Sequence, residues 1–88
     1  MYIGIEEILE IIEYNITIKF SNNEIKSLDM KPFLSKGMYA ELVDHNLFNK
    51  ARISFDTIEW PNGVDIDPEF VYEYSKSKLM GSDAVTSL

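Results

Sequence analysis

The most informative segment of the chain is residues 15–30, which read NITIKFSNNEIKSLDM. Apolar and polar residues alternate over residues 15–20, as in a half-buried β-strand. Residues 21–23 end in two asparagines, and asparagine is the residue other than glycine that best tolerates the positive φ of a tight turn. Alternation resumes over residues 24–30. The pattern therefore predicts a β-hairpin.

The apolar positions of this hairpin predict the face that is buried. They are Ile16, Ile18 and Phe20 on the first strand, and Ile25, Leu28 and Met30 on the return strand. Ile25 and Leu28 are an odd number of residues apart, so both can face the core only if the strand slips in register near Ser27. We expect such a slip.

Residues 5–13 are ambiguous when read alone. Ile5, Ile8, Leu9 and Ile12 have the spacing of one helix face, and the glutamates between them favour a helix. The β-branched isoleucines favour a strand instead, and no good N-cap residue precedes Ile5. These residues leave both alternatives open.

The remainder of the chain predicts short elements. Residues 31–34 indicate a break with one helical turn, and residues 44–50 a short helix capped by Asp44. Residues 51–60 predict two short strands on either side of Asp56.

The last predicted elements are a turn, a strand and a helix. Residues 61–63 are Pro-Asn-Gly, a strong turn former, and residues 64–66 continue as a strand. Asp67 is suited to cap a helix that begins at Pro68 and extends to about Lys78. Together the elements predict an α+β fold, a small antiparallel β-sheet with short helices packed against it.

Composition excludes several classes of protein. The 88 residues include 15 Asp and Glu, 8 Lys and Arg and no cysteine, and the net charge of −7 opposes direct binding to nucleic acid. Disulfides, thiolate zinc sites and cysteine nucleophiles are excluded.

No apolar run approaches the ~20 residues of a membrane span, and no basic leader is present. We expect a cytoplasmic protein without membrane contact, with one domain over residues 1–78 and a flexible tail over residues 79–88.

Two motifs stand out from this background. The first is the hairpin ending in Leu28-Asp29-Met30-Lys31-Pro32, and the second is Trp60-Pro61-Asn62-Gly63-Val64-Asp65-Ile66-Asp67-Pro68. Over roughly residues 5–74 the chain resembles a bacterial protein family, the domain-of-unknown-function family 2442. Its first hairpin strand ends in Phe-Ser-Asp-Gly, and its closing motif is Trp-Pro-Asn/Asp-Gly-x-Asp-x-x-Pro. This chain departs from the pattern by having Asn22-Asn23 in place of Asp-Gly.

The resemblance carries implications for both fold and function. The family begins with a strand, so it implies a strand rather than a helix over residues 5–11. It implies structural roles for Asp29, Pro32, Trp60, Pro61, Asn62, Gly63, Asp65, Asp67 and Pro68. The family has no established activity, but many members are encoded beside a small partner protein. That arrangement resembles a toxin–antitoxin pair and implies an antitoxin-like role for this chain.

The sequence contains no residue pattern typical of a catalytic or metal-binding site. Asp65, Asp67 and Glu69 lack the ligand pattern of a calcium loop, and His45 has no partner at catalytic spacing. Trp60 is expected to anchor the core and to find an acceptor for its indole N–H. We predict no catalytic residue, no metal site and no cofactor, and expect that the protein is not an enzyme.

The negative charge is concentrated in two segments. Residues 1–13 contain four acids and residues 53–75 contain six, and neither segment contains a base. If the segments meet in the fold, they form an acidic face that attracts a basic partner. The candidate partner-binding residues are the acids Glu6, Glu10, Glu69 and Glu73 and the aromatic residues Tyr39 and Tyr72.

We therefore expect a small acidic interaction module that binds a small basic protein, which the resemblance implies is toxin-like. One alternative is a homodimeric small-molecule-binding domain, because a chain of this size can barely form a pocket alone. The other is an accessory regulator that acts through a DNA-binding partner.

Overall fold

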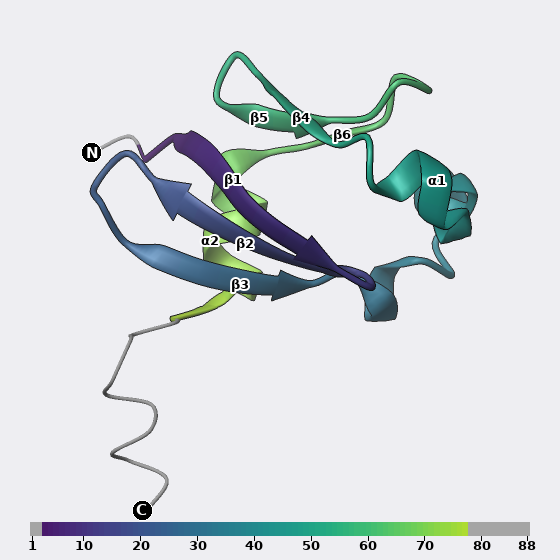
Figure 1. Cartoon of the computed structure of the whole chain (residues 1–88), viewed down its shortest axis with the longest axis horizontal. Coiled ribbons are helices and arrows are strands. Elements are labelled where there is room, and N and C mark those ends of the chain that lie inside the picture. Colours follow the sequence, from purple (N-terminus) through teal and green to yellow (C-terminus); the bar gives the residue numbers. More distant parts are fainter. Residues whose placement is uncertain (1–2, 78–88) are drawn as a thin grey trace, which may run out of the picture.

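The structure is a computed structural model, of which residues 3–77 are described (Figure 1). The larger of its two sheets is antiparallel, with strand order β1-β2-β3-β7. Its strands are β1 (Ile5–Ile12), β2 (Asn15–Phe20), β3 (Ile25–Asp29) and β7 (Lys76–Ser77). The smaller sheet is also antiparallel and consists of β4 (Arg52–Ser54), β5 (Thr57–Glu59) and β6 (Asp65–Ile66) in that order.

The helices are short. They are the 3-10 helices η1 (Lys31–Phe33) and η2 (Gly37–Val43) and the α-helices α1 (His45–Phe48) and α2 (Pro68–Tyr74). Figure 1 shows α2 behind the larger sheet and the smaller sheet above β1. The predicted α+β class and its antiparallel pairing are confirmed, and the later strands form a sheet of their own.

The central hairpin forms as predicted, but its return strand does not slip. Register is continuous from Asn15 opposite Asp29 to Lys19 opposite Ile25. Ile25 therefore lies on the opposite face from Leu28, and Lys26 occupies the inward position opposite Ile18. A lysine is tolerated there because its ammonium group donates to a backbone carbonyl of α2.

Strand β1 resolves the ambiguity of the N-terminal segment. Its pairing with β2 contains two irregularities, between Ile5 and Glu7 and between Ile8 and Glu10. Each is a β-bulge that adds one residue to β1. The β1 residues that lie opposite the buried residues of β2 therefore recur every three positions, at Ile5, Ile8 and Ile11. Of the four residues with helical spacing, only Ile5 and Ile8 therefore face inward, whereas Leu9 and Ile12 are exposed.

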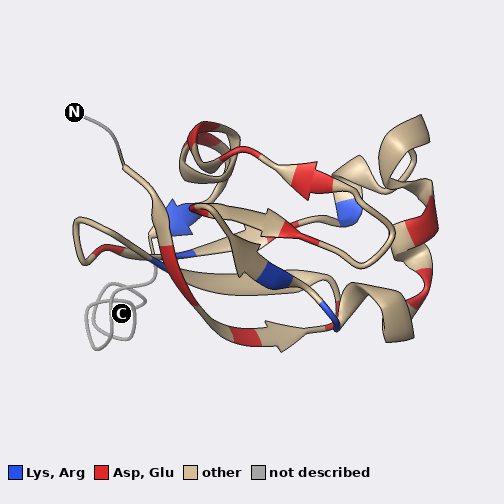
Figure 2. Ribbon diagram, turned by 90° about the horizontal axis from the view of Figure 1, so that it is seen from above, with Lys and Arg blue, Asp and Glu red and all other residues tan. Residues whose placement is uncertain are grey.

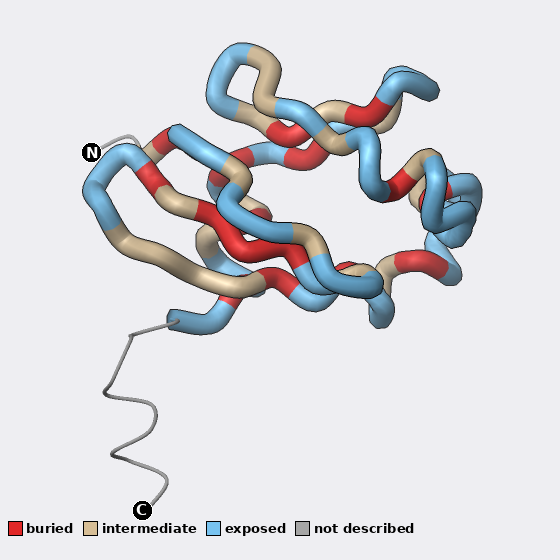
Figure 3. The backbone as a smooth tube through the Cα atoms, in the orientation of Figure 1, coloured by how far each residue is buried: buried red, intermediate tan, exposed pale blue. Residues whose placement is uncertain are grey.

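The core lies between the two sheets and α2. Figure 3 shows buried positions along the larger sheet and in the smaller sheet. The buried apolar residues are Ile5, Ile16, Ile18, Phe20, Leu28, Met30, Leu34, Leu42, Phe48, Ile58, Trp60, Ile66 and Val71. Trp60 is fully buried, and its indole N–H donates to the Phe48 carbonyl oxygen at 2.9 Å. The predicted core role of this tryptophan is confirmed.

Both α-helices begin where the sequence predicts, but α2 ends early. Asp44 caps α1 by accepting from the Asn46 amide at 2.9 Å. Asp67 occupies the N-cap position of α2 as predicted, but its side chain makes no capping hydrogen bond.

The expected extension of α2 to about Lys78 is wrong. The backbone becomes extended at Ser75, and β7 pairs with β3 at the edge of the larger sheet. This pairing satisfies backbone groups of β3 that a longer helix would leave without partners. The predicted tail over residues 79–88 lies outside the described residues. Within residues 3–77, no helix has the length and apolar character needed to cross a bilayer.

Candidate partner-binding surfaces

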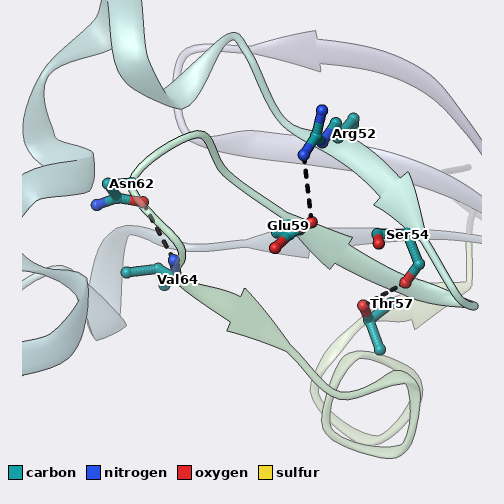
Figure 4. A network of polar contacts seen from close by, with 6 residues as sticks. All are labelled: Arg52, Ser54, Thr57, Glu59, Asn62 and Val64. Atoms are coloured by element: carbon teal, nitrogen blue, oxygen red, sulfur yellow. Dashed lines mark hydrogen bonds and ion pairs between the residues drawn. The ribbon is translucent and has the colours of Figure 1, made fainter.

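The tryptophan motif forms a tight connection between β5 and β6. The Trp60 amide donates to the Val64 carbonyl and the Gly63 amide donates to the Trp60 carbonyl, both at 2.9 Å. Gly63 has φ +91°, which glycine adopts without strain. The Asn62 side chain accepts from the Val64 amide at 3.2 Å (Figure 4) and donates to Glu41 at 2.8 Å.

The other motif residues lie at the ends of elements. The Asp29 carboxylate accepts from the Lys31 amide at 3.0 Å and so helps η1 to begin, and Pro32 lies within η1. Pro68 is buried at the start of α2, whereas Asp65 and Asp67 are exposed. The exposed carboxylates make no hydrogen bond or ion pair among the described residues, so they are free to face a ligand.

One surface hollow brings together three of the candidate residues. It has a volume of about 380 Å³ and is lined by Ile3, Glu69, Tyr72 and Glu73. The tyrosine is held in place because its hydroxyl group donates to Glu24 and Lys26 Nζ lies 3.8 Å from its ring centroid. This surface, named here the Tyr72 hollow, therefore presents beside a fixed aromatic ring two carboxylates that make no hydrogen bond or ion pair among residues 3–77.

The hydrogen bond between Tyr72 and Glu24 alters the ionisation of both groups. It lowers the pKa of Glu24 below its ordinary value of 4.5, with Asn22 as a second donor. It raises the pKa of Tyr72, because ionisation of the phenol would end its donation to the carboxylate. At neutral pH the pair is therefore a neutral phenol and a carboxylate.

A second hollow of about 380 Å³ contains Tyr39. Its lining, named here the Tyr39 hollow, consists of Tyr39, Thr57, Asp65, Ile66, Asp67 and Phe70. Burial, together with the nearby Asp65 carboxylate, raises the pKa of Tyr39. The Phe70 ring packs edge-on against Phe33, with ring centroids 5.1 Å apart. The hollow therefore combines aromatic walls with two carboxylates.

The candidate acids of β1 lie elsewhere. Glu6 forms a 3.3 Å ion pair with Lys19, and Glu10 lines a smaller hollow of about 210 Å³ on the sheet. Figure 2 shows the acidic positions of β1 and those of α2 on opposite sides of the molecule. The acids of residues 53–75 meet the N-terminal segment at two places: Glu69 and Glu73 line the Tyr72 hollow with Ile3, and the Asp56 backbone carbonyl accepts from the Ile5 amide at 3.2 Å. The acids of β1 and those of α2 thus form separate surfaces.

The structure also shows where the residues considered for metal binding and catalysis lie. Among residues 3–77, no group of three or more histidine and acidic side chains has the arrangement needed to hold a metal ion. His45 stacks on Tyr14, with ring centroids 4.6 Å apart and Nε2 3.2 Å from the tyrosine hydroxyl. This contact joins α1 to the turn between β1 and β2.

Phe55 is a surface feature that the sequence analysis did not single out. It is 96% exposed, at the tip of the β4–β5 hairpin. Residues 55–56 contain neither glycine nor asparagine, so nothing in the sequence marks them as the two-residue turn that the pairing of Ser54 with Thr57 creates. The turn gives positive φ to both residues, which Asp56 tolerates and Phe55 disfavours.

The molecule is thus a small α+β protein of two antiparallel sheets with two acidic, aromatic hollows beside α2. Residues 5–77 match the family described as "Protein of unknown function (DUF2442)", and the chain belongs to that family. The resemblance inferred from the hairpin and the tryptophan motif is confirmed. No curated protein and no solved structure shows significant similarity to the chain.

Proposed function

We propose that this protein is an acidic interaction module that binds a basic protein through the surface around α2. One observation carries the proposal. Every charged residue among the described residues that line the Tyr72 and Tyr39 hollows is an acid, and there are four of them: Asp65, Asp67, Glu69 and Glu73. A surface with one sign of charge attracts and orients a partner of the opposite sign.

The hollows also contain the side chains that interfaces favour. Tyrosine combines a large apolar contact area with a polar hydroxyl group, and it is enriched at the centres of interfaces. Tyr72 and Phe70 are already held by contacts within the protein, so little conformational entropy is lost when a partner covers them. In the Tyr39 hollow, the rings of Tyr39 and Phe70 are bordered by carboxylates and so suit lysine and arginine side chains, which pair with the acids and stack on the rings. The Tyr72 ring already has the Lys26 ammonium over it, so Glu69 and Glu73 supply the attraction in that hollow.

The biological role we propose for this binding is antitoxin-like. The basic partner is a small toxin-like protein, and the acidic module restrains it by covering its basic surface. This role rests on the family's gene arrangement, and it predicts that expression of the partner alone slows growth. Co-expression of this protein restores growth under the proposal.

A pull-down with paired charge variants tests the binding. Tagged wild-type protein, Glu69→Lys/Glu73→Lys and Glu10→Lys/Glu13→Lys are each recovered from the source organism, and bound proteins are identified by mass spectrometry. Both variants change the net charge by the same amount, but the second changes β1 and its turn rather than α2. We expect a stoichiometric basic protein with the wild type and the β1 variant, and its loss with the α2 variant.

Two outcomes contradict the proposal. If no basic protein accompanies the wild type, the module does not act in this way. If both variants lose the partner equally, net charge alone controls association and the hollows are not the site. Thermal unfolding of each variant by circular dichroism verifies that the proteins remain folded.

A further inference from the structure

We propose that Phe55, at the tip of the β4–β5 hairpin, is the apolar anchor by which a basic protein partner docks on this chain. The inference deepens the proposed function and rests on it, because it specifies where the partner binds. Phe55 is 96% exposed and its side chain makes no contribution to the core, so packing within the described residues does not account for an aromatic side chain at this position. The backbone conformation of Phe55 is a second, independent indication that this residue has a binding role.

The turn that carries Phe55 is strained. Ser54 pairs with Thr57, so the hairpin loop has two residues, and their φ values are +50° for Phe55 and +71° for Asp56. Positive φ at both positions is typical of a type I′ turn, for which Asn-Gly is the favoured sequence. A bulky residue in this region is a true conformational outlier, and such strain is concentrated at functional sites. Stability alone does not account for phenylalanine here.

Contacts with the start of β1 and across its own base hold the turn in place. The Asp56 carbonyl accepts from the Ile5 amide at 3.2 Å. A Cβ atom at Gly4 would lie 3.0 Å from the Asp56 Cγ, so the absence of a side chain at Gly4 permits the close approach. The Thr57 hydroxyl donates to the Ser54 carbonyl at 2.6 Å across the base of the turn (Figure 4). The aromatic ring is therefore presented on a fixed support, which reduces the entropy lost on binding.

The neighbouring surface indicates the chemistry of the partner. Thr57, two residues after Phe55, lines the Tyr39 hollow with Asp65 and Asp67. Two residues of extended chain span only about 7 Å, so the backbone of the aromatic tip lies close to the edge of the acidic hollow. A protein with an apolar pocket for the ring and lysine or arginine beside it complements this surface. A second copy of this acidic chain offers no such charge complementarity.

Site-specific photo-crosslinking tests the assignment even when the partner is unidentified. The probe is p-benzoylphenylalanine, which replaces Phe55 in the full chain expressed in the source organism. The control carries the same probe at Ile12, an exposed apolar residue at the far end of β1 (Figure 1). After irradiation we expect an adduct with one basic protein from position 55 and none from position 12.

The alternative outcomes overturn the inference. An adduct between two copies of the chain makes the tip a self-association surface. Equal adducts from both positions, or no adduct from position 55, show that Phe55 does not meet a specific partner. Since both probes replace exposed apolar side chains, a failure to fold does not confuse the comparison.

A double variant separates binding from stability. Phe55→Asn/Asp56→Gly has the favoured turn sequence, so we expect its melting temperature to rise by about 4–8 °C, the shift that corresponds to roughly 1 kcal/mol in a domain of this size. Affinity for the cross-linked protein should fall by about 30-fold, as for an interface hot spot. Unchanged affinity overturns the anchor.

The two proposals fail in different ways. If Glu69→Lys/Glu73→Lys abolishes partner recovery while Phe55→Asn/Asp56→Gly leaves affinity intact, the proposed function stands and the anchor assignment is wrong. If no basic partner is recovered by either method, both are wrong.

Discussion

At the scale of single residues, Tyr72 joins the helix α2 to the central hairpin. Its hydroxyl group donates to Glu24 in the hairpin turn, and its backbone carbonyl accepts from Lys26 Nζ at 2.6 Å. Its ring packs edge-on against Phe20, with centroids 5.1 Å apart. The same residue therefore shapes a proposed binding surface and holds the helix that carries it.

Substitution of Tyr72 by phenylalanine should change how stability depends on pH. The hydrogen bond lowers the folded-state pKa of Glu24 below 4.5. A lowered pKa contributes stability that is present above the unfolded-state value and is lost as the pH falls through the folded-state value. We therefore expect wild type to be more stable than Tyr72→Phe at pH 7, with the difference shrinking toward pH 3.

Urea denaturation at pH 7, 5, 4 and 3 measures this difference. The raised pKa of Tyr72 has the opposite dependence, because its contribution is complete below pH 10 and is lost above it. A difference between the two proteins that stays constant from pH 7 to pH 3 would contradict the assigned hydrogen bond.

Asn23 illustrates a turn residue whose role the sequence predicts correctly. Its φ is +73°, and its amide donates to the Phe20 carbonyl at 2.9 Å. Asn23→Val places a β-branched side chain in the left-handed region and should cost about 1–2 kcal/mol. Asn23→Gly, which restores the glycine of the family pattern, should be neutral or stabilising. Equal stability of the two variants, measured by thermal unfolding, would show that the turn has rearranged.

At the scale of elements, β1 shows how far a local pattern can be interpreted. Its inward positions recur every three residues because two bulges interrupt the pairing with β2, and this period is close to that of a helix. Bulges depend on the partner strand, so residues 5–13 alone could not distinguish the alternatives. The hairpin over residues 15–30 was predictable because its alternation and its turn are both local.

The early end of α2 was unpredictable for a similar reason. The sequence after Tyr74 has no strong helix breaker, and the chain turns away because Lys76 and Ser77 pair with β3, which lies far back in the sequence. Phe55 was also missed, since its turn is determined by the pairing of β4 with β5. The acids of the hollows were identified from charge, but their grouping required the fold.

Deletion of a bulge residue tests the interpretation of β1. Without Leu9, Ile8 still faces inward, Glu10 outward and Ile11 inward, in a regular alternation. We expect the deletion variant to unfold cooperatively, with a melting temperature within about 8 °C of wild type, which corresponds to roughly 1 kcal/mol.

Deletion of Thr17 from the regular strand β2 is the matched control. It moves part of the buried isoleucine set to the opposite face, and we expect loss of cooperative unfolding. If the Leu9 deletion is as damaging as the Thr17 deletion, the bulge assignment is wrong. Circular dichroism melts of the two proteins supply the comparison.

At the scale of the whole molecule, the two sheets meet where the start of β1 touches the β4–β5 turn. The contact consists of the hydrogen bond from the Ile5 amide to Asp56 and the close approach of Gly4. It lies next to the exposed Phe55. The position of the proposed anchor therefore depends on the junction between the sheets.

A double-mutant cycle measures this junction. Gly4→Ala brings a methyl group within 3.0 Å of the Asp56 side chain and should cost about 1 kcal/mol. Asp56→Gly removes the atoms that clash and suits the positive φ, so it should rescue the alanine variant. Denaturation of the four proteins gives the coupling energy, and a value near zero would show that the two positions do not touch in solution.

The complete burial of Trp60 has a practical consequence for all of these measurements. It is the only tryptophan in the chain, and its ring is shielded from water while the indole nitrogen is bound to a backbone carbonyl. Its fluorescence should therefore peak at short wavelength in the native protein and shift to the red on unfolding. Because the indole lines neither the Tyr72 hollow nor the Tyr39 hollow, the emission reports the state of the core and stays constant when a partner docks. Trp60 is thus an intrinsic fluorescence probe of folding whose signal is independent of partner binding.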